Sequence, residues 1–286
     1  MTSQEVEAPE PSDDVVAASE LHDAIRLLSQ ANRQQRHADI ERALVRLRRQ
    51  AASAMALETR VPPVPLPERA GDGQVAEVDA AGLSVASLRD GLARSGCLLV
   101  RGLISTERAE HLRVGMDAAL AAYDVAVAGS GVADPEWFDP LPMPDRSASG
   151  MDDAVHRAFL RGRGAMWTAD SPRMLFDLFE LVEESGLGAL MTEHLGERPV
   201  LSGIKGTMRR VPPDIEVDRR WHQDGSFLGQ EIRALNIWLA LTPCGRDAPG
   251  LDVVPKRVEH VVPRDADARF DWSLSDAAVQ EVARDA

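Results

Sequence analysis

A run of prolines divides this chain into two parts. Four of the seven residues at 61–67 are proline, and a proline inside a helix removes a backbone hydrogen bond and clashes with the preceding turn. No helix can therefore continue through this stretch, and we expect it to run extended. The sequence predicts a disordered start and a helical arm over residues 1–60, a Pro-rich linker over residues 61–74, and a main domain over residues 75–286.

The arm shows helical periodicity. Apolar residues recur every three or four positions in two sets, which predicts two helices: Leu21, Ile25 and Leu28, then Ile40, Leu44 and Leu47. Seven arginines between residues 26 and 49 are interleaved with acidic side chains. We interpret them as a solvated helix face that packs on the main domain or on a second subunit, which would make a homo-oligomer. The alternative, a DNA-binding element, is less favoured because of the interleaved acids.

The charge balance argues against nucleic acid and membrane surfaces as partners. The 286 residues include 46 acidic and 32 basic side chains, a net charge of −14, which repels phosphate backbones and anionic lipid. No stretch approaches the roughly 18 apolar residues of a membrane span. The first 16 residues carry five acids and no base, the reverse of a secretory signal. With Cys97 and Cys244 as the two cysteines, we expect reduced thiols and a cytoplasmic protein.

The first half of the main domain has the pattern of a strand followed by helices. An apolar run bounded by glycines at 96–104 is typical of a strand, and Ser105 can cap the helix that follows. Pro172 occupies a favourable first-turn position for another helix, and a further helix is expected to end near Leu195. Residues 125–151 are rich in Gly, Pro, Asp and Ser, which predicts a long loop that could act as a substrate lid.

Beyond residue 198 the pattern changes to short β-type segments. Five apolar, β-branched stretches predict strands at 200–211, 219–224, 235–241, 251–254 and 258–262. A mostly sheet second half that follows a mostly helical first half indicates an α+β domain.

Residues 221–225, with the sequence WHQDG, carry the chemistry. Residues two apart on a strand point to the same face, so His222 and Asp224 can present a nitrogen and an oxygen to one ion. Two histidines and one carboxylate form the facial triad of non-heme Fe(II) oxygenases, which leaves positions for a co-substrate and dioxygen. The simpler interpretation is a surface strand with both side chains exposed. In the next β-type segment, Asn236 and Trp238 share one face, which suits a co-substrate pocket.

Three motifs in this order resemble the phytanoyl-CoA dioxygenase family of Fe(II)- and 2-oxoglutarate-dependent oxygenases. They are WHQDG at 221–225, NIWLAL at 236–241 and APGLDVVP at 248–255. The glycine-bounded run and following helix near residue 96 also resemble the family, so the similarity covers about residues 75–265.

The resemblance implies a fold and a reaction. The fold would be a double-stranded β-helix, a cupin-like jelly roll buttressed by helices. His222 and Asp224 would bind Fe(II), and Trp238 would line the 2-oxoglutarate pocket. The reaction would consume 2-oxoglutarate and O2, release succinate and CO2, and hydroxylate a small organic molecule. Hydroxylation is favoured over halogenation because Asp224 fills the position that a halide needs.

The resemblance also implies a second histidine ligand and an arginine for 2-oxoglutarate, which are not evident. His260 follows His222 by 38 residues, whereas a jelly roll needs on the order of 45 residues between its ligand strands. His260 is therefore a weak candidate for the third ligand, and we expect the remaining strands to follow residue 286. Lys205, one of two lysines, could reach a carboxylate of 2-oxoglutarate.

Two other functions fit the same residues. A chain without the third ligand could be a non-catalytic relative that acts as a binding or scaffold protein. A cupin-like metalloenzyme that does not use 2-oxoglutarate is the other alternative. Succinate formation separates the three hypotheses.

Overall fold

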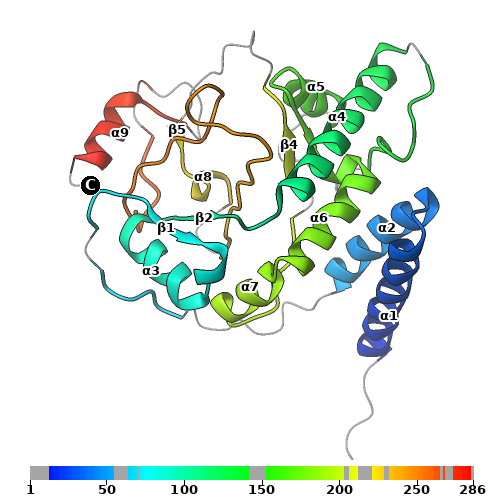
Figure 1. Cartoon of the computed structure of the whole chain (residues 1–286), viewed down its shortest axis with the longest axis horizontal. Helices are drawn as coiled ribbons and strands as arrows, with labels where there is room; N and C mark the ends of the chain where they lie inside the picture. Colours follow the sequence, from blue (N-terminus) through cyan, green and yellow to red (C-terminus); the bar gives the residue numbers. More distant parts are fainter. Residues whose placement is uncertain are drawn as a thin grey trace, which may run out of the picture.

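The computed structural model describes residues 13–54, 64–69, 71–129, 131–141, 153–202, 206–211, 221–228, 232–264, 267 and 273–284. Helices dominate this part of the chain (Figure 1). They are α1 (Asp13–Gln34), α2 (Ala38–Ala54), α3 (Val85–Ser95), α4 (Thr106–Ala128), α5 (Asp153–Arg161), α6 (Pro172–Glu184), α7 (Leu187–Leu195), α8 (Gly225–Leu228) and α9 (Asp276–Ala283). None of the helices in these ranges is long and apolar enough to cross a bilayer.

The core of the main domain lies between α4 and α6, which pack against each other (Figure 1). Both helices begin where the sequence predicts. The Ser105 side chain accepts a hydrogen bond from the Arg108 backbone N–H, and Pro172 stands in the first turn of α6. The apolar faces of the two helices bury a shared cluster that includes Leu112, Met116, Leu120, Tyr123, Met174 and Leu181.

Part of the predicted lid packs on this core. The ring centroids of Phe138 and Tyr123 lie 5.1 Å apart in an edge-to-face contact, and Phe138 is buried. Arg157 of α5 donates to both carboxylate oxygens of the buried Asp170, and it also donates to the Leu141 carbonyl. Residues 131–141 are therefore fixed to the body. Of the rest of the predicted loop, residues 125–128 form the end of α4 instead, and residues 130 and 142–151 lie outside the described residues.

The N-terminal helices form a hairpin that docks on the main domain. Helices α1 and α2 pack against each other, and α2 packs against α6 (Figure 1). The hairpin buries Leu44, Val45 and Ala51. Two packing partners were proposed for the arm, the main domain and a second subunit. In the structure the arm packs on the main domain of the same chain.

The prediction of a double-stranded β-helix is wrong for the described residues. These hold three two-stranded sheets. β1 (Ala76–Asp79) is parallel to β2 (Leu98–Arg101), β3 (Ala165–Trp167) is antiparallel to β4 (Thr207–Arg209), and β5 (Trp221–His222) is antiparallel to β6 (Ser273–Leu274).

The jelly roll is not seen in the described residues because the segments predicted as its strands do not pair with one another. The predicted segments at 235–241, 251–254 and 258–262 run in the described residues without regular secondary structure. A strand forms only where a neighbouring backbone accepts and donates its ladder of hydrogen bonds. Ile237, Leu251 and Val253 also remain exposed, whereas a jelly roll buries such residues between two sheets. The buried cluster of the main domain is built mainly by side chains of α4 and α6, to which Met166 of β3 and Met208 of β4 add.

Candidate functional site

The structure brings the two predicted metal ligands together. His222 is the last residue of β5 and pairs with Ser273 of β6. Asp224 lies two residues further on, in the turn that leads into α8, where its carbonyl accepts a hydrogen bond from the Leu228 N–H. The Nε2 atom of His222 lies 3.7 Å from Oδ1 of Asp224, and the two side chains are 42% and 31% exposed. The pair is thus half-buried and accessible to small ligands.

A third side chain holds the Asp224 carboxylate. Asn236 Nδ2 donates a hydrogen bond of 2.7 Å to Oδ2 of Asp224. Trp238, two residues further along the same segment, is 52% exposed. Asn236 was expected to contact the co-substrate, and in the structure its side chain contacts Asp224. Lys205, which was also expected to contact the co-substrate, lies outside the described residues.

Gln223, to which the sequence analysis assigned no role, connects the WHQDG motif to residues 260–262. Its Oε1 accepts a hydrogen bond of 2.6 Å from the Val262 N–H, and its Nε2 lies 3.5 Å from the His260 carbonyl oxygen. Gly225 adds to this contact, because a Cβ atom there would lie 2.9 Å from Cγ2 of Val261. The signal in the sequence was the amide itself, because a glutamine side chain can both accept and donate hydrogen bonds to a neighbouring backbone.

The backbone of His260 lies beside the WHQDG motif, where its carbonyl oxygen accepts a hydrogen bond from Gln223. The residue itself is exposed. Among the described residues no group of three or more His, Cys, Asp or Glu side chains could hold one ion. The third ligand therefore stays unassigned.

The donor pair fits part of an Fe(II) site. Two ligands at right angles on a first-row metal, each about 2.1 Å from the ion, lie about 3.0 Å apart. The observed 3.7 Å exceeds this by about 0.7 Å, which a small side-chain rotation can close. One imidazole and one carboxylate are also the ligand types that such an ion prefers.

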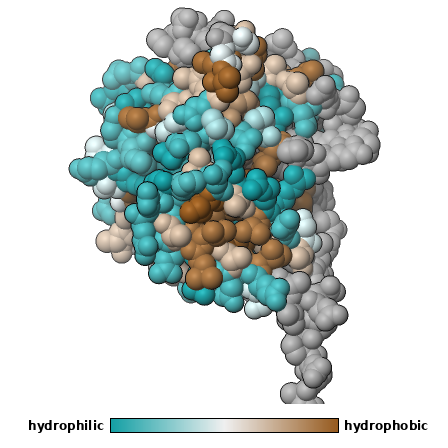
Figure 2. Space-filling view, turned by 90° about the vertical axis from the view of Figure 1, so that its right-hand side faces the viewer, coloured by the Kyte–Doolittle hydropathy of each residue, from teal (hydrophilic) through white to brown (hydrophobic). Residues whose placement is uncertain are grey.

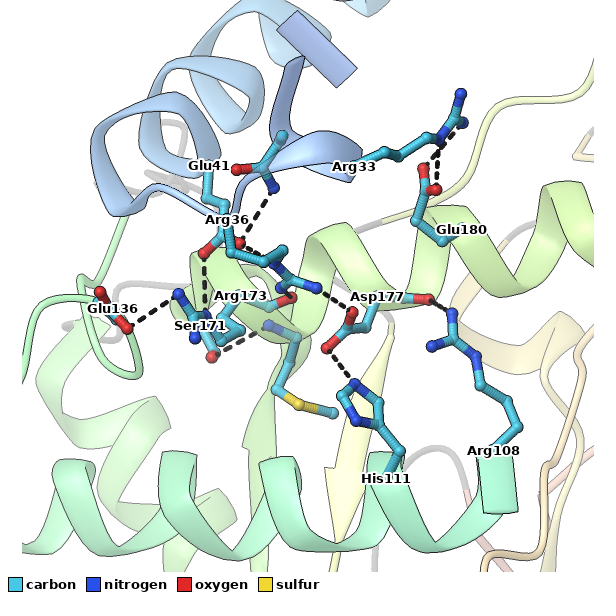
Figure 3. Close-up of polar contacts among 12 residues, drawn as sticks. Arg33, Arg36, Glu41, Arg108, His111, Glu136, Ser171, Arg173, Asp177 and Glu180 are labelled. Carbon is cyan, nitrogen blue, oxygen red and sulfur yellow. Dashed lines mark hydrogen bonds and ion pairs between the residues drawn. The ribbon is translucent and has the colours of Figure 1, made fainter. Parts of the chain in front are cut away.

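The densest group of buried charges lies elsewhere, between the helical hairpin and α6. Glu41 is fully buried, and it accepts hydrogen bonds from Asn32, Arg36 and Arg173. Arg36 also donates to the buried Asp177, as Figure 3 shows. Burial alone would lower the pKa of Arg36, but the hydrogen bonds and charges of Asp177 and Glu41 outweigh it and raise the pKa.

This network has the character of a docking interface. Arg33 pairs with Glu180 of α6, and His111 Nε2 of α4 lies 3.3 Å from Asp177 (Figure 3). The buried carboxylates each have a cationic partner, so the network is neutralised within the chain. We interpret it as the attachment of α1 and α2 to the body.

Two hollows on the surface are separate from the His222–Asp224 pair. One, of about 350 Å³, is lined by both signs of charge, including Arg94, Lys256, Arg257 and Glu259. The other, of about 720 Å³, lies over the hairpin beside Leu21 and Leu141. Figure 2 shows apolar side chains gathered on this side of the molecule.

Comparison with known proteins gives no relative for this chain. No family model, no curated protein and no solved structure matches it. Any functional assignment therefore rests on the residues and their geometry.

Proposed function

We propose that the chain is an Fe(II)- and 2-oxoglutarate-dependent dioxygenase that hydroxylates a small organic molecule and releases succinate and CO2. His222 and Asp224 are its iron ligands. The observation that carries the proposal is their convergence, with Nε2 and Oδ1 3.7 Å apart. The motifs that resemble the phytanoyl-CoA dioxygenase family add support. The jelly roll of that family is not part of the proposal.

The protein's own residues hold and orient the ligands. The β5–β6 pairing fixes the backbone of His222, and Asn236 and Gln223 fix the carboxylate and the turn of Asp224. Bound Fe(II) would supply a Lewis acid and redox centre for 2-oxoglutarate and dioxygen. The exposed indole of Trp238, near this pair in the chain, is suited to cover an apolar part of a bound small molecule.

We also propose a cytoplasmic setting with no nucleic-acid or membrane partner. The net charge of −14 and the free thiols of Cys97 and Cys244 support this setting. Self-association through the outer face of the α1–α2 hairpin stays a prediction.

The test is succinate production from 2-oxoglutarate by the purified chain with Fe(II) in air. We expect succinate from the wild type and its loss in His222→Ala and in Asp224→Ala. Asp252→Ala, which changes an exposed aspartate outside the site, is the matched control and should behave as wild type. Succinate formation that persists in Asp224→Ala would overturn the proposal.

A second candidate is a non-catalytic binding protein. The observation in its favour is that the described residues bring two metal-ligating side chains together and not three. Iron binding without succinate would support this candidate or a metalloenzyme that does not use 2-oxoglutarate, whereas succinate would exclude both.

A further inference from the structure

Helix α5 has its polarity reversed relative to an ordinary surface helix. Ala154, Val155, Ala158 and Phe159 share one face, and all four are exposed, with Val155 at 54% and Phe159 at 46%. A surface helix of a globular protein normally turns its apolar face toward the core. None of the nine residues of α5 is buried, so the helix presents this apolar face to a partner.

The charged side of α5 faces the body instead. Arg157 donates hydrogen bonds of 2.8 and 2.9 Å to the buried Asp170. Arg161 donates hydrogen bonds of 2.7 and 2.5 Å to the two carboxylate oxygens of Asp124, on the neighbouring α4 (Figure 1). These contacts fix the rotation of α5 about its axis, because the apolar face could turn inward only if both ion pairs broke.

The two ends of the apolar face carry opposite charges. Asp153 begins the helix, and its side chain is 36% exposed. Arg163 follows the end of the helix, where its guanidinium carbon lies 3.9 Å from the centre of the Phe159 ring. A partner that fits this face is therefore an apolar surface with the same two charges in the reverse order.

A second copy of this chain meets that requirement. When two α5 helices pack antiparallel about a two-fold axis, the same surface is used on both copies, and Asp153 of each copy lies at the Arg163 end of the other. Residues 153 and 163 are equally distant from residue 158 in the sequence, so the axis passes near Ala158. Its small side chain favours the short end of the 8–10 Å range of interaxial distances.

We propose that the exposed face of α5, formed by Ala154, Val155, Ala158 and Phe159, binds the same face of a second copy in an antiparallel arrangement. The inference does not depend on the iron site. Four side chains are far fewer than the roughly 20–30 residues on each side of a standard interface. We therefore expect a weak dimer whose population rises with protein concentration.

Sedimentation velocity over a series of concentrations measures this association in the purified full chain, whose monomer mass is 31.1 kDa. Val155→Glu and Phe159→Glu each place a charge on the face. The matched control is Leu27→Glu, which changes an apolar residue of α1 that is similarly exposed, at 56%. Circular dichroism checks that each variant is folded.

We expect the mass of the wild type and of Leu27→Glu to approach twice the monomer value at high concentration. The two α5 variants should associate at least about 10-fold more weakly, as for residues at the centre of an interface. A wild type that stays monomeric, or equal association in all four proteins, would overturn the proposal. Association that is lost in Leu27→Glu and kept in the α5 variants would place the contact on the helical hairpin and would also overturn it.

A charge exchange tests the antiparallel arrangement itself. Arg163→Asp leaves two acidic ends and Asp153→Arg leaves two basic ends, so each variant alone should associate more weakly than the wild type. An equal mixture of the two variants pairs opposite charges at both ends and should recover the association. A mixture that associates no better than its components would overturn the arrangement. Binding of a monomeric wild type to phosphatidylcholine vesicles would show that the face takes lipid instead.

Discussion

Replacing Glu41 by alanine is expected to release the helical hairpin from α6. The Glu41 side chain is fully buried and accepts hydrogen bonds of 3.1 Å from Asn32, 2.6 Å from Arg36 and 3.2 Å from Arg173. The substitution leaves two guanidinium groups in a partly buried site without this carboxylate. Removing one partner of a buried ion pair costs about 3–5 kcal/mol, so we expect a loss of this order in the free energy that holds the hairpin in place.

Hydrogen–deuterium exchange of peptides from α1 and α2 measures this loss directly. Exchange in the hairpin should accelerate in Glu41→Ala, while the α4 peptides should keep more of their protection, because local opening does not require the core to unfold. Glu183→Ala is the matched control. Glu183 pairs with Arg33 but is 69% exposed, and such surface pairs contribute about 0–1 kcal/mol.

Equal exchange rates in the two variants would refute the reasoning, since they would mean that the buried carboxylate contributes no more than an exposed one. A double-mutant cycle with Arg36→Ala gives a second check. The effects of the two substitutions should not add, because each removes the same contact.

Three further substitutions test other parts of the fold by urea unfolding. Burial lowers the pKa of Arg48 to about 10. Arg48→Met removes the buried charge and replaces the cation–π contact with Phe179 by a thioether–aromatic contact, so it should leave stability unchanged or raise it by up to roughly 4 kcal/mol; a large loss would contradict this. Burial also lowers the pKa of His194 below its ordinary 6.5, so stability should fall as the pH drops through 6.5, because the unfolded chain takes up the proton more readily; His194→Gln should reduce this fall, and an unchanged fall would refute the assignment. Gly96 has φ +72° and lies where a Cβ atom would be 2.8 Å from the Lys256 carbonyl oxygen. Gly96→Ala should therefore cost at least about 1–2 kcal/mol for the left-handed backbone alone, and a neutral effect would contradict this.

The helices could be predicted because their signals are local. Ser105 and Pro172 mark the starts of α4 and α6, and α7 ends at Leu195 as expected. A cap and a helical apolar face are contained within neighbouring turns of the chain. These elements therefore need no knowledge of distant partners.

The second half could not be predicted in the same way, because a strand depends on a distant partner. Apolar, β-branched stretches satisfy only one condition for a strand, and the pairing backbone must come from elsewhere. The same applies to the charge network, in which Arg36 meets Asp177 across 141 residues of chain. The arginines of the arm were visible in the sequence, but their buried partners were not.

The candidate site could be predicted only in part, because some of its contacts also depend on residues that are distant in the chain. His222 and Asp224 converge as their spacing suggested, although Asp224 lies in a turn rather than on a strand. The hydrogen bond from Asn236 to Asp224 depends on how a segment without regular secondary structure is anchored. The predicted common face of Asn236 and Trp238 could not reveal this bond.

The most direct test of the account is anaerobic equilibrium dialysis of the full chain against Fe(II). We predict a single saturable iron site in the wild type, with affinity reduced by at least about 10–100-fold in His222→Ala and in Asp224→Ala and unchanged in Asp252→Ala. Iron binding that is the same in all four proteins, or that is absent from the wild type, would contradict the assignment of His222 and Asp224 as metal ligands.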